Sequence, residues 1–280
     1  MSSTDNCSVA DEGSRSVLEA IPLRGVRVAL SVSEPADVGA DGRAELTDAI
    51  GSIVQQIVAD GGTVVFCPRL PLSDLSRVVI ERATPVDDDH LSLLLVVPEI
   101  EYSRYSVKYL RELKKSLQPT GALVLVTSSG ERATLDHTLT SSADAVAPSH
   151  ALAALRDFVA KSTDARIALG GKLGDRPEDE PGIVQECRLS LAAGGIVLPL
   201  GGFGGAAGAV DHLIRSRELM PRTVETSSSN DAQPWADQVR QLSATSHVVL
   251  ASEPALASSR DPNELAVAAC RGLRLLLSRL

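Results

Sequence analysis

One stretch of the chain reads Ile196-Val-Leu-Pro-Leu-Gly201-Gly202-Phe203-Gly204-Gly205-Ala206-Ala207, and an earlier one reads Arg166-Ile-Ala-Leu-Gly170-Gly171-Lys172. In each, an apolar run predicts a buried strand and the glycines that follow it predict a tight loop. A helix is predicted after each loop, and the one after Lys172 opens with Pro181-Gly182. Glycine has no Cβ, so its backbone N–H groups can turn toward a ligand, and a helix N-terminus favours negative charge. The two loops therefore predict a site for a ligand that carries phosphates, such as a nucleotide.

The rest of the chain alternates strand patterns with helix patterns. Strands are predicted at residues 26–32, 63–66, 93–97, 122–127, 166–169, 196–200 and 247–251. Helices are predicted at residues 43–59, 105–117, 151–161, 183–193, 206–217 and 263–277. This alternation predicts an α/β fold: a Rossmann-like, doubly wound and mainly parallel sheet with helices on both faces. Residues 1–24 predict a flexible N-terminal tail, and residues 25–280 are expected to form a single domain of this type.

Composition argues against several classes of partner. The 280 residues carry a net charge of −9, and the aromatic residues are three Phe, three Tyr and one Trp. Nucleic-acid binding needs a basic face or rings on which bases can stack, so no nucleic-acid partner is expected. No apolar run approaches the roughly 20 residues of a membrane span, so no membrane partner is expected either.

The cysteines indicate a reducing compartment, and the histidines argue against a metal site in the protein. Cys7, Cys67, Cys187 and Cys270 form no C-x-x-C pair, and the polar start of the chain does not resemble a signal peptide, so a cytoplasmic location is expected. The five histidines show no spacing typical of metal ligands, so neither a metal nor another cofactor is expected.

With these motifs in view, the chain resembles the SLOG superfamily. The resemblance rests on Gly170-Gly171-Lys172, on Pro181-Gly182-Ile183 with Glu186, and on Gly201-Gly202-Phe203-Gly204-Gly205-Ala206-Ala207. It is similar to the prokaryotic branch related to the sensor domains of TRPM-type ion channels. In that branch a strand ends in G-G-[RK], a loop leads to P-G-I-x-E-E, and the next strand ends in G-G-F-G-G-A. The beginning, Arg27-Val-Ala-Leu-Ser31-Val-Ser33-Glu34-Pro35, also resembles the first strand of that branch.

The resemblance implies a Rossmann-like sheet that binds nucleotides or NAD-derived nucleotides such as ADP-ribose and its cyclic relatives. Some members sense such molecules for a fused or partner effector, often in immunity to phage, whereas other branches cleave N-glycosidic bonds. From the loops and the resemblance together, the expected ligand-binding residues are Ser31, Ser33, Gly170, Gly171, Lys172, Pro181, Gly182, Glu186, Gly201, Gly202, Phe203, Gly204 and Gly205.

The chain departs from the family pattern in three places. Phe66-Cys67-Pro68-Arg69 stands where the family has an aromatic residue followed by G-G-D. Gln185-Glu186 stands where the family has two glutamates, so one carboxylate remains. The loop between Lys172 and Pro181 is rich in acidic residues.

Each candidate also has a simpler structural explanation. The glycines at 201–205 either give a diphosphate or adenosine room beside Phe203 or allow close packing between helix and strand. Glu186 either binds ribose hydroxyls, acts as a catalytic carboxylate, or complements the dipole of its helix. Ser31 and Ser33 lie at the end of the first strand, where serines contact ligands or form turns.

Three hypotheses about function remain open. The first is a module that binds or senses an NAD- or ADP-ribose-like ligand; it predicts that Gly202→Val or Gly204→Val abolishes binding while the fold survives. The second is a nucleotide N-glycosidase with Glu186 as its catalytic carboxylate, against which the missing second carboxylate argues. The third is a scaffold that binds only proteins. A homo-oligomer or a separate effector protein is the partner expected of a sensor, in a prokaryotic defence or signalling system.

Overall fold

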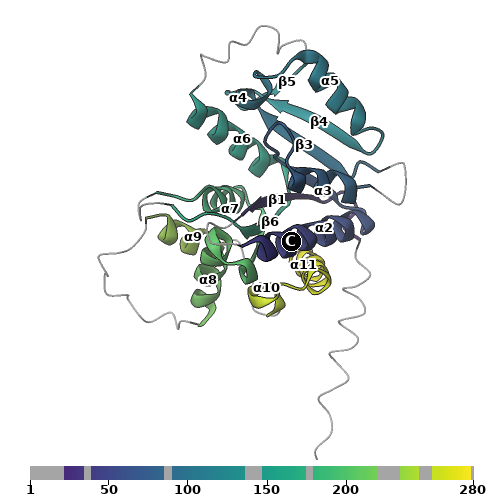
Figure 1. Cartoon of the computed structure of the whole chain (residues 1–280). Coiled ribbons are helices and arrows are strands. Elements are labelled where there is room, and N and C mark those ends of the chain that lie inside the picture. Colours follow the sequence, from purple (N-terminus) through teal and green to yellow (C-terminus); the bar gives the residue numbers. More distant parts are fainter. Residues whose placement is uncertain are drawn as a thin grey trace, which may run out of the picture.

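The computed structural model describes residues 22–34, 39–84, 90–135, 147–174, 179–219, 234–245 and 254–278. Within them, a seven-stranded sheet in the order β5-β4-β3-β2-β1-β6-β7 carries helices on both faces (Figure 1). All neighbouring strands are parallel except β4 and β5, which are antiparallel. The prediction of a Rossmann-like, mainly parallel α/β fold is therefore confirmed.

The strands are short and apolar, which is typical of a parallel sheet buried on both faces. Their bounds are β1 Arg27–Ser33, β2 Thr63–Phe66, β3 Leu93–Pro98, β4 Gly121–Val126, β5 Arg132–Ala133, β6 Ala165–Gly170 and β7 Ile196–Leu200. The buried side chains of β2, β3, β6 and β7 are mostly those of Val, Leu, Ile and Ala. Because aromatic residues are scarce, aliphatic side chains fill the space between the sheet and the helices.

Helices cover both faces of the sheet. Their bounds are α2 Ala40–Ala59, α3 Asp74–Arg82, α4 Glu99–Tyr102, α5 Val107–Ser116, α6 Pro148–Ser162, α7 Gly182–Ala192, α8 Gly205–Leu219, α9 Pro234–Thr245, α10 Ala255–Ser258 and α11 Pro262–Leu277, with a 3-10 turn η3 at Gly201–Phe203. Leu30 and Phe66 share a core with α2 and α11, whereas Ala29 and Val65 pack with Leu155 of α6 on the opposite face.

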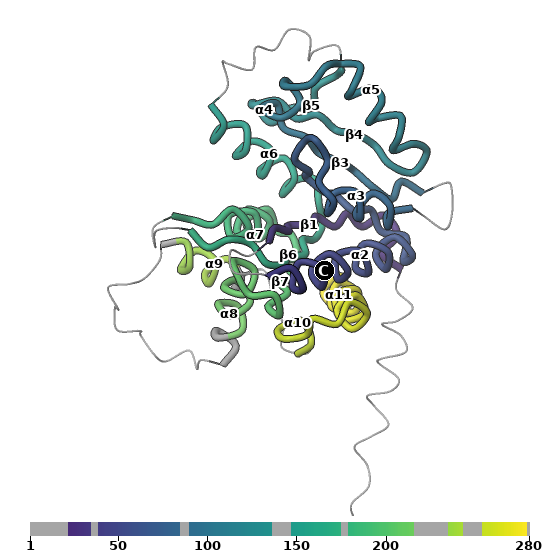
Figure 2. The backbone as a smooth tube through the Cα atoms, viewed as in Figure 1, coloured from purple at the N-terminus to yellow at the C-terminus, as the bar shows by residue number. Residues whose placement is uncertain are grey.

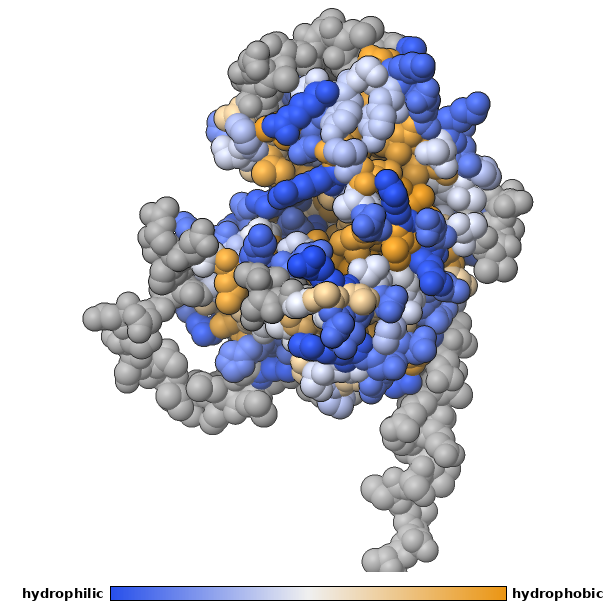
Figure 3. All heavy atoms as spheres, in the orientation of Figure 1, coloured by the Kyte–Doolittle hydropathy of each residue, from blue (hydrophilic) through white to orange (hydrophobic). Residues whose placement is uncertain are grey.

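The C-terminal helix closes the fold against its N-terminal part. Helix α11 runs beside α2 (Figure 2), and Arg274 Nη2 donates a hydrogen bond of 2.5 Å to Asp60 Oδ2 just after α2 ends. On the face drawn in Figure 3, hydrophobic residues show mainly between the part that carries β3 and β4 and the part that carries α2 and α11. The C-terminal segment is therefore an integral layer of the fold.

Strand order places a topological switch point between β1 and β6. From β1 the chain crosses through α2 to β2 on one side, whereas β6 lies on the other side of β1 and leads through α7 to β7. The two crossovers diverge, so a crevice opens outside the carboxyl ends of β1 and β6, where α/β folds bind their ligands. Both glycine loops follow strands on this side of the switch point.

Most predicted elements match the structure within a few residues, with some differences. Helix α2 begins at Ala40, three residues before the predicted start, and β1 ends one residue later than predicted. The sequence analysis missed α3, α4, β5, α9 and α10. Leu23, which was assigned to the tail, is fully buried in the core. Residues 1–21 of the expected tail and the strand expected at 247–251 lie outside the described residues.

None of the described helices combines the length and the apolar character that crossing a bilayer requires.

Candidate functional site

The two glycine loops meet at the switch point. The N–H of Gly171 donates to the carbonyl of Ser33 at 2.7 Å, which extends the β1–β6 pairing past the end of β6. The N–H of Ala206, in the first turn of α8, donates to the carbonyl of Gly171 at 3.1 Å. The ends of β1 and β6 and the start of α8 are therefore joined through one residue.

Packing explains several glycines of the second loop. A Cβ on Gly201 would lie 2.7 Å from the carbonyl oxygen of Ala257, and one on Gly202 would collide with the carbonyl of Ser259. Both contacts are with backbone near α10, which cannot move like the end of a side chain. The expectation that Gly202→Val leaves the fold intact is therefore wrong, because any side chain there displaces the segment that leads into α11.

Close approach and backbone conformation explain the other glycines. Gly205 has a φ of +61°, and its Cβ would collide with the carbonyl of Gly171. Gly171 has a φ of +93°, and its Cβ would lie 2.6 Å from Ile183 Cδ1. Gly204 combines a φ of +65° with a ψ of −147°, a region that essentially only glycine occupies, yet its Cβ would meet nothing within 4 Å. The backbone of Gly204 thus borders open space.

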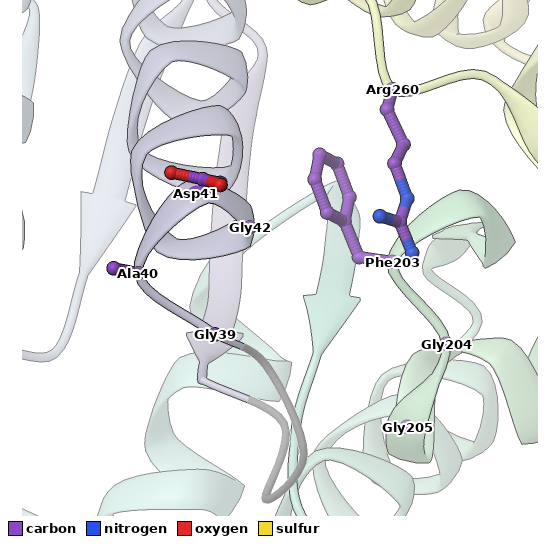
Figure 4. A pocket seen from close by; sticks show the side chains of 8 residues that line it. All are labelled: Gly39, Ala40, Asp41, Gly42, Phe203, Gly204, Gly205 and Arg260. Atoms are coloured by element: carbon purple, nitrogen blue, oxygen red, sulfur yellow. The ribbon is translucent and has the colours of Figure 1, made fainter.

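That space is a cavity of about 400 Å³ beside the second glycine loop (Figure 4). Its lining comprises Gly39, Ala40, Asp41 and Gly42 at the start of α2, then Phe203, Gly204, Gly205 and Arg260. Gly39 caps α2 in an extended conformation without a side-chain hydrogen bond. The first backbone N–H groups of α2 therefore lie at the wall of the cavity, and such groups favour an anion.

Arg260 and Phe203 lie side by side on the opposite wall (Figure 4). The guanidinium carbon lies 5.8 Å from the centre of the Phe203 ring, and Arg260 Nε donates to the carbonyl of Gly202 at 2.8 Å. Arg260 was not singled out from the sequence because it lies far along the chain, in the short link between α10 and α11. Phe203 is buried, so its ring supports the arginine more than it offers a free face to a ligand.

A polar cluster lies on the other face of the sheet, around Glu186 of α7. Its Oε2 accepts hydrogen bonds from Ser31 Oγ of β1 and, at 3.0 Å, from Arg166 Nη1 of β6. Its Oε1 lies 3.5 Å from Arg156 Nε of α6. Three elements thus contact one carboxylate of α7, and a pair of arginines compensates its charge.

Arg166 forms the base of this cluster. Its side chain is 2% exposed, its Nη1 also donates to Ser31 Oγ, and its Nε donates to Ser190 Oγ at 2.8 Å. Its Nη2 is buried and has no hydrogen-bond partner among the described residues. A buried donor without a partner points to a further acceptor at this place, such as water or a ligand oxygen.

Gly182 makes room for the second arginine. A Cβ on Gly182, the first residue of α7, would lie 2.7 Å from Arg156 Nη2. Arg156 Nη1 donates to Gln185 Oε1 and so lies over the first turn of α7, beside Glu186. Pro181 caps the helix and is buried. The Pro-Gly pair therefore shapes the start of α7 so that an arginine from α6 can approach it.

Two cysteines near the cluster are held as thiols. Burial raises the pKa of Cys67 to about 12, and the charge of Glu186 raises it further against the opposing effect of Arg166. Burial likewise raises the pKa of Cys187 to about 12. Neither group is a thiolate near neutral pH, so the cluster contains no activated cysteine nucleophile.

The structure brings most of the expected site residues to the switch point, in two groups. Phe203, Gly204 and Gly205 line the cavity on the α2 side, and Ser31 and Glu186 belong to the cluster on the α7 side. Ser33, Gly170 and Gly171 form the edge between them, and Lys172 follows as an exposed side chain. The sequence analysis did not single out Arg156, Arg166 or Arg260. Within the described part of the chain, no group of three or more His, Cys, Asp or Glu side chains could hold a metal ion.

Comparison with known proteins identifies the family. A family model described as SLOG cluster2 matches residues 22–253. The chain belongs to the SLOG family. The resemblance found in the glycine motifs is thereby confirmed for the superfamily, and SLOG membership links the chain to the binding or processing of nucleotide-related ligands. No curated protein matches the sequence. The SLOG match ends before α10 and α11, so Arg260 lies outside it.

Proposed function

We propose that this SLOG protein binds an NAD- or ADP-ribose-like nucleotide without cleaving it, as the recognition step of a sensor. The observation that carries the proposal is the meeting of both glycine loops at the topological switch point, with a polar group on either side. The cavity beside Gly204 offers cationic and N–H donors for phosphates, whereas the Glu186 cluster offers an acceptor for hydroxyl groups.

The two-sided arrangement favours a ligand with two ends. The cavity lies against the start of α2, whereas Glu186 is on α7, which packs on the opposite face of the sheet. Between them runs the edge formed by Ser33 and Gly171. A dinucleotide or a nucleoside diphosphate sugar would cross this edge with its diphosphate and place a ribose near Glu186. A mononucleotide would occupy only one side and is expected to bind more weakly.

The contacts of Glu186 support binding over catalysis. A general base or nucleophile needs an oxygen that is free to take a proton or attack a carbon. Oε2 of Glu186 accepts from both Ser31 and Arg166, and Oε1 faces Arg156. The carboxylate is therefore suited to hold ribose hydroxyls in a fixed position.

The proposal is tested by incubating the purified full chain with NAD, ADP-ribose, cyclic ADP-ribose and AMP. Mass spectrometry then follows the small molecules retained by the protein and those left free. Retention of an intact two-ended nucleotide, with weaker retention of AMP, is the expected result. Release of a free base with its sugar phosphate would replace binding by N-glycosidic cleavage, with Glu186 as the catalytic residue. Retention of none of the four compounds would reject the proposed ligand class.

Matched variants assign the outcome to the cluster. Glu186→Gln keeps the size of the side chain and removes its charge, and it is expected to weaken retention of ribose-containing ligands. Glu180→Gln, in the loop just before α7, is the control, because Glu180 pairs with Arg188 at 2.7 Å and 3.0 Å outside the cluster. Equal retention by both variants would remove Glu186 from the binding site.

A further inference from the structure

The cavity wall includes one cation from a part of the chain that the SLOG match does not cover. Arg260 lies in the link between α10 and α11, beyond residue 253, and lines the same cavity as the start of α2 and the second glycine loop. No expectation from the glycine motifs includes this segment. The cavity is thus completed by a segment that follows the family-matched region.

Arg260 is held in place by its neighbours. Its Nε is fixed by the carbonyl of Gly202 at 2.8 Å, and its guanidinium lies over the Phe203 ring. The backbone around it is also anchored, because Asp261 caps α11 through the N–H groups of Asn263 and Glu264. An arginine held this way loses little conformational freedom when it binds an anion.

The ion pair that Arg260 already makes leaves its guanidinium available to another anion. Arg260 Nη1 lies 3.6 Å from Glu45 Oε2, with both side chains about half exposed (55% and 48%). An exposed pair of this kind contributes little, about 0–1 kcal/mol, and salt screens it. The guanidinium therefore keeps most of its capacity to pair with a stronger anion such as a phosphate.

The remaining lining is compatible with an anion, with one opposing charge. Gly204 leaves open space, and the uncapped start of α2 supplies N–H groups. Asp41, in the first turn of α2, is the acidic residue among the lining residues. Its carboxylate would repel a phosphate, so removing it should strengthen binding.

We propose that Arg260 binds a phosphate group of the ligand in the cavity beside Gly204, so that the C-terminal helices complete the binding site. This inference rests on the proposed function for the identity of the whole ligand, but the anion site itself makes a separate prediction. The ligand class that the cavity recognises is a phosphate or diphosphate ester. Arg260 contributes a cation that the other lining residues of the cavity lack.

Inorganic pyrophosphate is the probe that tests the anion site without a nucleotide. Isothermal titration calorimetry of the full chain at fixed ionic strength is expected to show binding by the wild type. Arg260→Ala should weaken it about 10- to 100-fold, the usual effect of losing a hydrogen-bonded charged partner. Arg260→Lys should fall between the two, because lysine keeps the charge but loses the planar fork. Asp41→Asn should bind more tightly than the wild type.

Arg77→Ala serves as the control for a general loss of positive charge. Arg77 is an exposed arginine of α3 that does not line the cavity, so its removal is expected to leave pyrophosphate affinity unchanged. Thermal unfolding of each variant checks that the fold is kept. Equal affinity of the wild type and Arg260→Ala, or no binding of pyrophosphate to the wild type, would overturn the inference.

The two proposals fail in different ways. Pyrophosphate binding that depends on Arg260, together with no retention of any nucleotide, would keep the anion site and reject the proposed ligand. Retention of a nucleotide with equal affinity by wild type and Arg260→Ala would keep the proposed function and reject the role of Arg260.

Discussion

Arg166 Nη1 donates a hydrogen bond of 3.0 Å to Glu186 Oε2 and thereby ties the middle of the sheet to the second turn of α7. The arginine is 2% exposed, whereas the carboxylate side chain is 25% exposed. A charge as deeply buried as Arg166 requires a partner of opposite charge, and Glu186 supplies it. The same contact fixes the orientation of the carboxylate that we expect to face the ligand.

Replacing Glu186 should destabilise the protein more than replacing Glu180, a carboxylate before α7 that also pairs with an arginine. Glu186→Gln leaves Arg166 buried without its counter-charge, and we expect a loss of about 2 kcal/mol in the free energy of unfolding. Glu180→Gln breaks a pair with Arg188 in which both side chains are 22% exposed, so we expect a loss under about 1 kcal/mol. Urea denaturation of the three proteins measures the difference. Equal losses would show that Arg166 does not depend on Glu186.

Two glycines close in sequence should respond in opposite ways to alanine. Gly202→Ala forces a Cβ into the carbonyl of Ser259, and we expect it to destabilise the protein by roughly 2–3 kcal/mol or to prevent folding. Gly208→Ala, inside α8, adds a Cβ in ordinary contact with the carbonyl of Gly201 at 3.5 Å. Because alanine favours helix, it should be neutral or stabilise by up to about 1 kcal/mol. Thermal unfolding compares the two variants, and a stable Gly202→Ala would contradict the packing around η3.

The buried thiol of Cys187 should make stability decrease at high pH. Its pKa is raised by burial from 9.0 to about 12, so between these values the folded protein keeps a proton that the unfolded chain has lost. Unfolding then releases protons, and the free energy of unfolding falls as pH rises above 9. Cys187→Ala should remove part of this decrease. Denaturation curves at pH 8 and above check the slope, and identical slopes in the wild type and the variant would refute the assignment.

The order of strands and helices could be predicted because most strands are apolar runs ended by a clear break. β2 and β7 were predicted with the bounds that the structure shows, since glycines or polar residues flank both. The short elements escaped prediction for a physical reason. β5 has two residues, and its place is set by pairing with β4 rather than by its own sequence pattern. α3 and α9 have polar sequences whose helical form depends on tertiary packing.

The site could be predicted only where its residues follow strands in glycine-rich motifs. Gly171 and Gly204 are recognisable because few residues tolerate their backbone conformations. Arg166 was hidden because it lies near the start of an apolar strand, where its burial is explained only by Glu186 from the next helix. Arg156 and Arg260 come from segments distant in sequence, and only the packing of α6 and of the α10–α11 link brings them near. Whether the glycine loops bind the ligand stays a prediction.

Hydrogen exchange followed by mass spectrometry, with and without ADP-ribose, tests the central claim most directly. We expect slower exchange in peptides that span the start of α2, the 201–208 segment and the first turns of α7, because ligand contacts there would protect the backbone amides. Peptides of β4 and α5, far from the switch point, should exchange at the same rate in both samples. Protection confined to those distant peptides, or no protection at ligand concentrations that saturate binding, would contradict a nucleotide site at the carboxyl ends of β1 and β6.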